Sequence, residues 1–184
     1  MRNPRPISPA EYPLLADFLY HAIFIPPGTE PAPREVIEKP EIAVYIDGFG
    51  SQKGDTGVLS VQENKIVGAA WTRIIPAFGR IDDETPELAI SVLPEYRGQG
   101  TGTELLKALF EKLSEQGYRQ TSLSVQKENP ALRLYQRMGY KTVRENDEDY
   151  IMVRSLKEEM RGTNDGMCAK AAAVQTSLPV IAAR

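Results

Sequence analysis

The feature that most constrains the fold is a strand, glycine loop, helix and strand in the middle of the chain. Residues 87–93 are almost continuously apolar, as in a strand buried on both faces of a sheet. Leucines and a phenylalanine at helical spacing over residues 105–113 predict a strong helix that ends at Gly117. Residues 121–125 then predict another strand. Elements in this order predict two parallel strands joined by a right-handed crossover.

The segments on either side of this unit predict further helices and strands. A helix is expected to begin at Ser8, which has capping-box spacing to Glu11, and to end near Phe24, with Pro13 weakening its first turns. The other expected elements are broken helical structure over residues 36–49 interrupted at Pro40, a hairpin of residues 58–61 and 66–75, a short helix from Asn129 to Gly139, and a hairpin of residues 140–145 and 150–156. This pattern favours an α+β fold, a mixed sheet with helices on both faces.

Length and composition suit one soluble domain. The chain has 184 residues, of which 41% are hydrophobic and 26% are charged, enough for one substantial core without disulfides. We assign residues 1–156 to this domain. Residues 157–184 are partly alanine-rich and show no strong periodicity, so we interpret them as a C-terminal tail that could be flexible.

Charge and cysteine content narrow the partners and the compartment. The formal net charge of -3 offers no broad basic face for nucleic acid. No segment approaches the length of a membrane span, and the basic N-terminus is not followed by an uninterrupted apolar stretch. The single cysteine, Cys168, cannot form an internal disulfide. We therefore expect a cytoplasmic protein that does not engage a membrane.

A glycine-rich loop separates the apolar strand from the strong helix. Gly98, Gly100 and Gly102 follow Arg97 in this loop. Glycines let a ligand approach the backbone closely, and the N-terminus of a helix attracts a phosphate. We therefore predict a pyrophosphate site here, with glycines that serve only a tight turn as the alternative.

Two other phosphate-binding loops fit poorly. The Walker A loop needs a Gly-Lys-Ser/Thr ending, whereas Gly102 is followed by Thr103 and Glu104. The Rossmann fingerprint needs G-x-G-x-x-G and an acidic residue at the end of the next strand, whereas this chain has G-x-G-x-G and no such acid. A nicotinamide or flavin enzyme is therefore a distant alternative.

The loop resembles motif A of the GNAT superfamily of N-acetyltransferases, whose pattern Gln/Arg-x-x-Gly-x-Gly/Ala is met by Arg97, Gly100 and Gly102. Residues 88–96, with the sequence LAISVLPEY, resemble the strand that precedes this motif in the family. Residues 129–140, with the sequence NPALRLYQRMGY, resemble motif B. Outside this region the chain agrees with the family only in its pattern of helices followed by strands.

The resemblance implies a GNAT-like central sheet with acetyl-CoA bound between two splayed parallel strands. By this analogy the backbone of Ile90 and Val92 pairs with the pantetheine arm, and Asn129 holds the arm from the other side; a simple helix cap is the alternative for Asn129. The expected contacts of the pyrophosphate are Gly98, Gln99, Gly100, Thr101, Gly102 and Thr103, with the Arg97 peptide shaping the loop. No metal ligand is assigned.

The resemblance also implies catalytic roles for two side chains. Tyr135 occupies the motif B position where many family members place the proton donor for the departing CoA thiolate, and packing alone is the alternative. Glu87 begins the strand in which family members often carry a glutamate base, although its register against that glutamate is open. Strand alternation places Glu87 on the face of Ala89 and Ser91, opposite to that of Ile90.

Two functions follow from these implications. The first is direct transfer of an acetyl group from acetyl-CoA to a primary amine, on a small molecule, a peptide N-terminus or a lysine. The second is a non-catalytic module that binds or senses acyl-CoA. The expected partner is an amine-bearing acceptor, a homodimer is left open, and nucleic acid is not expected.

Overall fold

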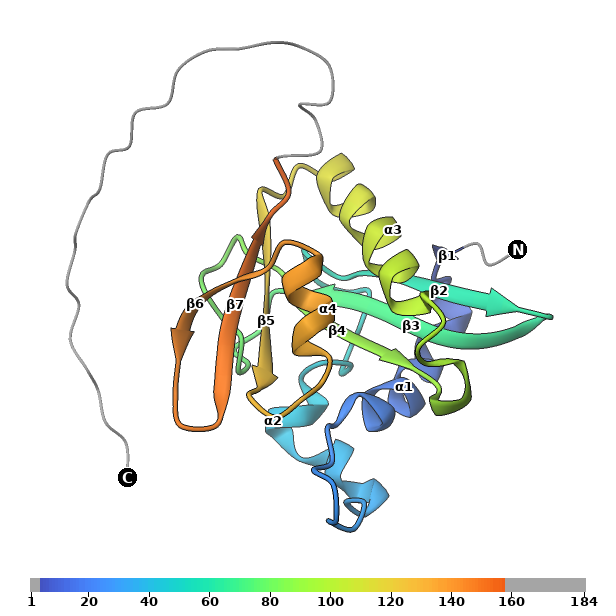
Figure 1. Ribbon diagram of the computed structural model, residues 1–184. Helices are drawn as coiled ribbons and strands as arrows, with labels where there is room; N and C mark the ends of the chain where they lie inside the picture. Colours follow the sequence, from blue (N-terminus) through green and yellow to red (C-terminus); the bar gives the residue numbers. More distant parts are fainter. Residues whose placement is uncertain (1–3, 158–184) are drawn as a thin grey trace.

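The computed structural model describes residues 4–157 of the chain, which form one seven-stranded sheet in the order β1-β2-β3-β4-β5-β7-β6 (Figure 1). The strands are β1 (Arg5–Pro6), β2 (Thr56–Gln62), β3 (Lys65–Arg73), β4 (Glu87–Val92), β5 (Gln120–Gln126), β6 (Lys141–Glu145) and β7 (Asp149–Ser155). The helices are α1 (Leu15–Ala22), α2 (Pro40–Ala43), α3 (Thr101–Glu115) and α4 (Leu132–Arg137). Neighbouring strands are antiparallel except for β4 and β5, which are parallel. The predicted α+β fold with a mixed sheet is confirmed.

The predicted strand, helix and strand correspond to β4, α3 and β5. Three leucines at helical spacing, Leu105, Leu109 and Leu113, are fully buried on the inner face of α3. Beyond Glu115 the chain turns at Gly117, whose φ of 85° lies in the left-handed region that ends many helices. The helix therefore ends where the sequence predicts.

The core lies on both faces of the sheet. Because successive strand residues point to opposite faces, Val58 and Leu59 of β2 belong to different clusters. The cluster under α3 and α4 includes Leu105, Leu106, Leu109, Phe110 and Leu113 with Val58, Ala70, Leu88, Leu123 and Met152. The cluster under α1 includes Leu15, Phe18 and Leu19 with Phe49, Leu59, Ala69 and Trp71. Helices therefore cover both faces, as predicted (Figure 1).

The two parallel strands diverge. Their register contains a single pair of residues, Glu87 of β4 and Ser122 of β5. The Ser122 N–H also donates to the Pro86 carbonyl at 3.0 Å, so the strands are joined only at their amino-terminal ends. Figure 1 shows β4 and β5 running apart from this junction. The structure therefore contains the splay that the family resemblance implied.

Element boundaries differ from the prediction where prolines and turns decide them. The first helix begins as a 3₁₀ segment, Pro9–Leu14, because Pro13 has no N–H for a regular helix, and α1 ends at Ala22. The β2–β3 hairpin is longer at its tip than expected. Its two turn residues, Glu63 and Asn64, both have positive φ values, which lets the strands pair up to the turn.

The tail predicted for residues 157–184 lies outside the described residues except for Lys157. None of the helices within residues 4–157 is long and apolar enough to cross a membrane.

Candidate active site

The loop between β4 and α3 has the open geometry of an anion site. Gly98 and Gly100 have φ values of 71° and 88°, which side chains rarely allow. A Cβ built on either glycine would meet no described atom within 4 Å. Gly100 is the N-cap of the fifteen-residue helix α3, and as a glycine it has no side chain to cap the helix. The positive end of the helix dipole therefore faces open space, which suits a pyrophosphate.

The side chain of Arg97 makes two hydrogen bonds in addition to the loop-shaping role predicted for its peptide. Its Nε donates a hydrogen bond to the carbonyl oxygen of Val92 at 2.8 Å. Its Nη2 donates to the carbonyl oxygen of His21, at the end of α1, at 3.3 Å. The side chain thus ties the carboxyl end of β4 to α1, a contact between distant segments that the motif did not reveal.

Two other predicted ligands turn their side chains back onto the protein. The Gln99 amide donates to the Glu95 carbonyl at 3.1 Å. Thr101 is buried, and its hydroxyl donates to the Tyr96 carbonyl at 3.4 Å. Backbone groups are therefore what these two positions offer to a phosphate.

The first turn of α3 packs against α4. A Cβ on Gly102 would lie 3.1 Å from Cδ2 of Leu134, so glycine lets the two helices approach each other. Thr103, in the same turn, is partly exposed. Because Tyr135 follows Leu134 in α4, this contact fixes the helix that carries the predicted proton donor next to the glycine loop.

Beyond the Glu87–Ser122 pair, one edge of β4 is not paired with β5 and faces the gap between the two strands. The Leu93 N–H donates to the Val67 carbonyl at 2.9 Å, which places odd-numbered residues of β4 in hydrogen bonds to β3. Even-numbered residues, among them Ile90 and Val92, therefore direct their backbone groups toward β5. This is the backbone that the resemblance assigns to the pantetheine arm.

Asn129 lies just past the carboxyl end of β5, across the gap from the glycine loop. Its Oδ1 accepts the Ala131 N–H at 2.9 Å, and α4 begins one residue later at Leu132. The predicted cap is therefore an Asx turn ahead of the helix. Since parallel strands present their carboxyl ends at one edge, this turn and the glycine loop flank the same opening.

Tyr135 is half-buried on α4. Its ring packs edge-on against Tyr140, with centroids 5.9 Å apart. Burial raises the pKa of the Tyr135 phenol to about 12. The phenol therefore keeps its proton at neutral pH, as a proton donor must.

Glu87 is buried at the junction of the two parallel strands, with 2% of its surface exposed. Its Oε1 accepts hydrogen bonds from the Tyr45 hydroxyl and from the Gly79 N–H, the latter at 2.8 Å. Its Oε2 is buried and has no hydrogen-bond partner among the described residues. Burial raises the pKa of Glu87, and the bonds from Tyr45 and Gly79 oppose this rise.

The sequence offers Tyr45 only as one of several aromatic residues that could line the acceptor cleft, and it reveals neither the contact of Tyr45 with Glu87 nor that of Gly79. Tyr45 lies in the turns after α2, forty-two residues before Glu87, and Gly79 lies in the loop after β3. A Cβ on Gly79 would come within 2.8 Å of both Glu87 and the backbone of β5, so only glycine fits there. No local pattern in the sequence signals either contact, because both depend on how the sheet brings distant loops together.

Comparison with known proteins gives three related findings. Residues 20–140 match the model of the Acetyltransferase (GNAT) family. A [Ribosomal protein bS18]-alanine N-acetyltransferase of Haemophilus influenzae is 31% identical over 100 residues, which cover 52% of this chain and 64% of that protein. An N-alpha-acetyltransferase of Saccharolobus solfataricus is 29% identical over 114 residues, 53% of this chain and 68% of that protein.

The fold is also shared with solved structures. The PaiA N-acetyltransferase of Thermoplasma acidophilum, crystallised with coenzyme A, superposes with a TM-score of 0.63 at 18% identity, over 84% of this chain and 99% of that chain. The alignment with the Haemophilus relative spans less than two thirds of that protein's length. The family match spans well over half of the present chain, which therefore belongs to the GNAT family of acetyltransferases.

Proposed function

We propose that the protein transfers the acetyl group of acetyl-CoA to a primary amine, with a peptide N-terminus as the favoured acceptor. The observation that carries the proposal is the gap between β4 and β5. It opens toward the glycine loop, and the buried Glu87 lies at the opposite end, where the two strands pair. A CoA thioester has a pyrophosphate near one end and a slender arm that ends in the thioester. An exposed helix N-terminus next to an unpaired strand edge offers matching groups for both parts.

In this proposal, backbone groups hold the cosubstrate. The N–H groups around Gly98 and Gly100 bind the pyrophosphate, and the backbone of Ile90 pairs with the amides of the arm. Of the two backbone groups of Val92 at the gap, the carbonyl already accepts a bond from Arg97. The Asn129 turn lines the other side of the opening.

The chemistry needs one proton acceptor and one proton donor. As the acceptor nitrogen bonds to the acetyl carbon, Glu87 takes the amine proton on Oε2, the carboxylate oxygen without a hydrogen-bond partner among residues 4–157. The bond from the acetyl carbon to sulfur breaks, and Tyr135 gives its phenolic proton to the CoA thiolate. The raised pKa of each residue suits its role, because Glu87 becomes a stronger base and Tyr135 stays protonated until the thiolate forms.

The relatives support the choice of acceptor. Both curated relatives are named for acetylation of an N-terminal amine, in one case the alanine of ribosomal protein bS18. A peptide N-terminus is also less basic than a lysine side chain, so more of it is the neutral nucleophile at pH 7. We therefore favour an α-amine over a lysine.

The experiment is a panel of amines with purified protein and acetyl-CoA. The panel contains short peptides with free N-termini, the same peptides with a blocked N-terminus and one lysine, and a small diamine. Thiol release measures turnover, and mass spectrometry locates the acetyl group. We expect thiol release and a product acetylated at the α-amine only with the free N-termini.

Other outcomes separate the alternatives. Product only with lysine peptides or the diamine contradicts the favoured acceptor but keeps the enzyme. Acetyl-CoA binding by calorimetry without thiol release for any amine favours the sensing module. Absence of acetyl-CoA binding contradicts both functions.

A further inference from the structure

We propose that Tyr45 is a positioning residue for Glu87, whose hydroxyl holds Oε1 of the carboxylate so that Oε2 faces the acceptor amine. This inference rests on the proposed function, in which Glu87 is the base. Tyr45 does not touch the reacting atoms in this scheme. It acts through the one carboxylate that does.

The hydrogen bonds around Glu87 are one-sided. The Tyr45 hydroxyl and the Gly79 N–H both donate to Oε1, while Oε2 has no partner among the described residues. Most buried carboxylate oxygens that serve only the fold are hydrogen-bonded, since an unpaired buried acceptor is unfavourable. Two donors on one oxygen fix the orientation of the carboxylate and leave the other oxygen for a ligand proton.

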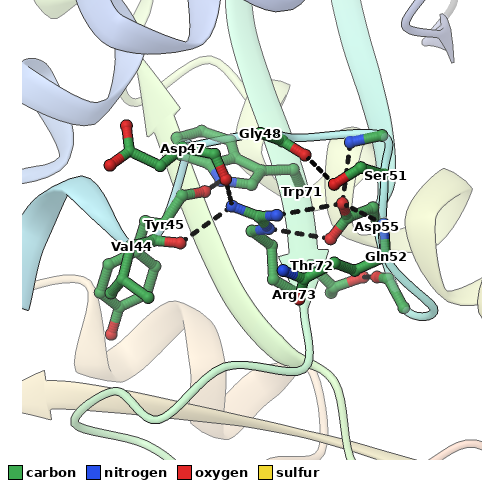
Figure 2. A network of polar contacts seen from close by, with 12 residues as sticks. Val44, Tyr45, Asp47, Gly48, Ser51, Gln52, Asp55, Trp71, Thr72 and Arg73 are labelled. Atoms are coloured by element: carbon green, nitrogen blue, oxygen red, sulfur yellow. Dashed lines mark hydrogen bonds and ion pairs between the residues drawn. The ribbon is translucent and has the colours of Figure 1, made fainter.

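The backbone around Tyr45 is fixed by a buried network (Figure 2). Arg73 Nη1 donates to the carbonyl of Val44 at 3.0 Å and to that of Asp47 at 2.6 Å. The indole N–H of Trp71 donates to the Tyr45 carbonyl at 3.0 Å. Figure 2 shows these carbonyls directed at β3, while the Tyr45 ring points away from the Arg73 guanidinium. The network therefore holds the main chain and leaves the phenol free to reach Glu87.

The network is anchored on an ion pair. Arg73 Nε lies 2.8 Å from Asp55 Oδ1, and the two side chains are each 1% exposed. Asp55 Oδ2 also accepts the N–H groups of Gly50 and Gln52. In the β3–β4 ladder Arg73 is the direct partner of Glu87. Arg73 of β3 thus holds the main chain next to Tyr45, while Glu87, opposite Arg73 on β4, carries the carboxylate that Tyr45 orients.

Charged side chains of β3 and β7 lie near the pair of Tyr45 and Glu87. Arg73, from β3, is committed to Asp55. Burial, followed by the charge of Glu87, raises the pKa of Tyr45, and Asp149 of β7 adds a smaller upward effect. Tyr45 therefore stays protonated and donates. Removing its hydroxyl leaves the burial of Glu87 less opposed, which raises the pKa of Glu87 further.

The test compares Tyr45→Phe with Tyr20→Phe and Glu87→Gln in the same assay, with the same peptide acceptor, across pH. Tyr20→Phe, on α1, is the control, because the Tyr20 hydroxyl also donates one hydrogen bond, to the Ala32 carbonyl at 2.7 Å. We expect Tyr45→Phe to lower kcat about tenfold at neutral pH, with KM for acetyl-CoA unchanged. The acidic limb of the kcat–pH profile of Tyr45→Phe moves to higher pH, so the loss of kcat relative to wild type becomes smaller as the pH rises. Tyr20→Phe keeps the wild-type profile.

The outcomes distinguish this inference from the proposed function. If Glu87→Gln keeps the wild-type kcat, the base assignment fails and Tyr45 has nothing to position. If Glu87→Gln is inactive while the acid limb of Tyr45→Phe stays at the wild-type pH, the positioning role is wrong. Should Tyr45→Phe fail to fold by circular dichroism, 3-fluorotyrosine at position 45 replaces it. This more acidic phenol is a stronger donor and must move the acid limb to lower pH, and an unmoved limb overturns the inference.

Discussion

The two sides of the gap between β4 and β5 are built in different ways. The side assigned to acetyl-CoA consists of backbone groups from short continuous segments, residues 97–103 and 129–131. The side assigned to the acceptor consists of side chains from distant segments: the Tyr45 hydroxyl bonds to Glu87, and Arg73 bonds to the main chain next to Tyr45. A backbone site can be recognised from local sequence, whereas a side-chain network appears only when the sheet has formed.

This contrast predicts separable effects. Changes in the glycine loop alter acetyl-CoA affinity and leave the base intact. Changes in the side-chain network alter stability or turnover and leave acetyl-CoA affinity close to that of wild type.

The largest effect is expected for Asp55→Ala. The substitution leaves the Arg73 guanidinium buried without its carboxylate, and breaking such a pair typically costs about 3–5 kcal/mol. Urea denaturation measures the loss in the free energy of unfolding. Glu95→Ala is the control, because its ion pair with Lys65 is exposed and should contribute little. A stable Asp55→Ala protein would show that the network does not hold this side of the site.

Glu87→Gln is expected to lower kcat about a thousandfold, within the range for loss of a positioned base. Acetyl-CoA affinity should stay near that of wild type, because the proposed cosubstrate site consists of backbone groups on the other side of the gap. Glu111→Gln, the same substitution at an exposed position of α3, serves as the control. Steady-state kinetics and calorimetry on one preparation check both statements.

The same variant carries a prediction about stability. The pKa of Glu87 is raised in the folded protein, so its contribution to stability is fully present at low pH and is lost as pH rises through the folded-state pKa. At neutral pH the buried charge of Glu87 therefore lowers the stability of the folded protein. Glu87→Gln should melt at a higher temperature than wild type at pH 7, and the advantage should disappear in acid. Destabilisation at pH 7 would argue for a structural carboxylate.

The sequence predicts most of the fold and the backbone half of the site. Apolar residues at strand and helix spacing identify β4, α3 and β5, because burial alone decides those elements. Glu87 was found through the family resemblance, but its partners were not. Tyr45 and Gly79 reach it from separate loops, and the contact of Arg97 with His21 likewise joins segments seventy-six residues apart. Local sequence patterns carry no information on contacts between such distant segments.

Gly100→Val tests the backbone half. The side chain would occupy the open space where a pyrophosphate meets the loop, and loss of one or two charge-assisted bonds predicts acetyl-CoA binding about 100-fold weaker. Gly117→Val is a matched control, because Gly117 also has a positive φ and open space around it but lies at the other end of α3. Both variants share the backbone strain, so their melting temperatures should fall alike. Equal affinities in the two variants would exclude the loop as the phosphate site.

Tyr135→Phe removes one hydroxyl and keeps the ring that packs on Tyr140. If the phenol protonates the departing thiolate, kcat should fall about 100-fold, the lower end of the range for a general acid, because water can substitute in part. Acetyl-CoA affinity should stay near that of wild type, since the proposed cosubstrate site consists of the loop and the strand edge. A tyrosine that serves only packing predicts the reverse pattern, with a lower melting temperature and unchanged turnover per folded molecule. Melting temperature, dissociation constant and kcat measured on one preparation separate the two, and an unchanged kcat removes Tyr135 from the chemistry.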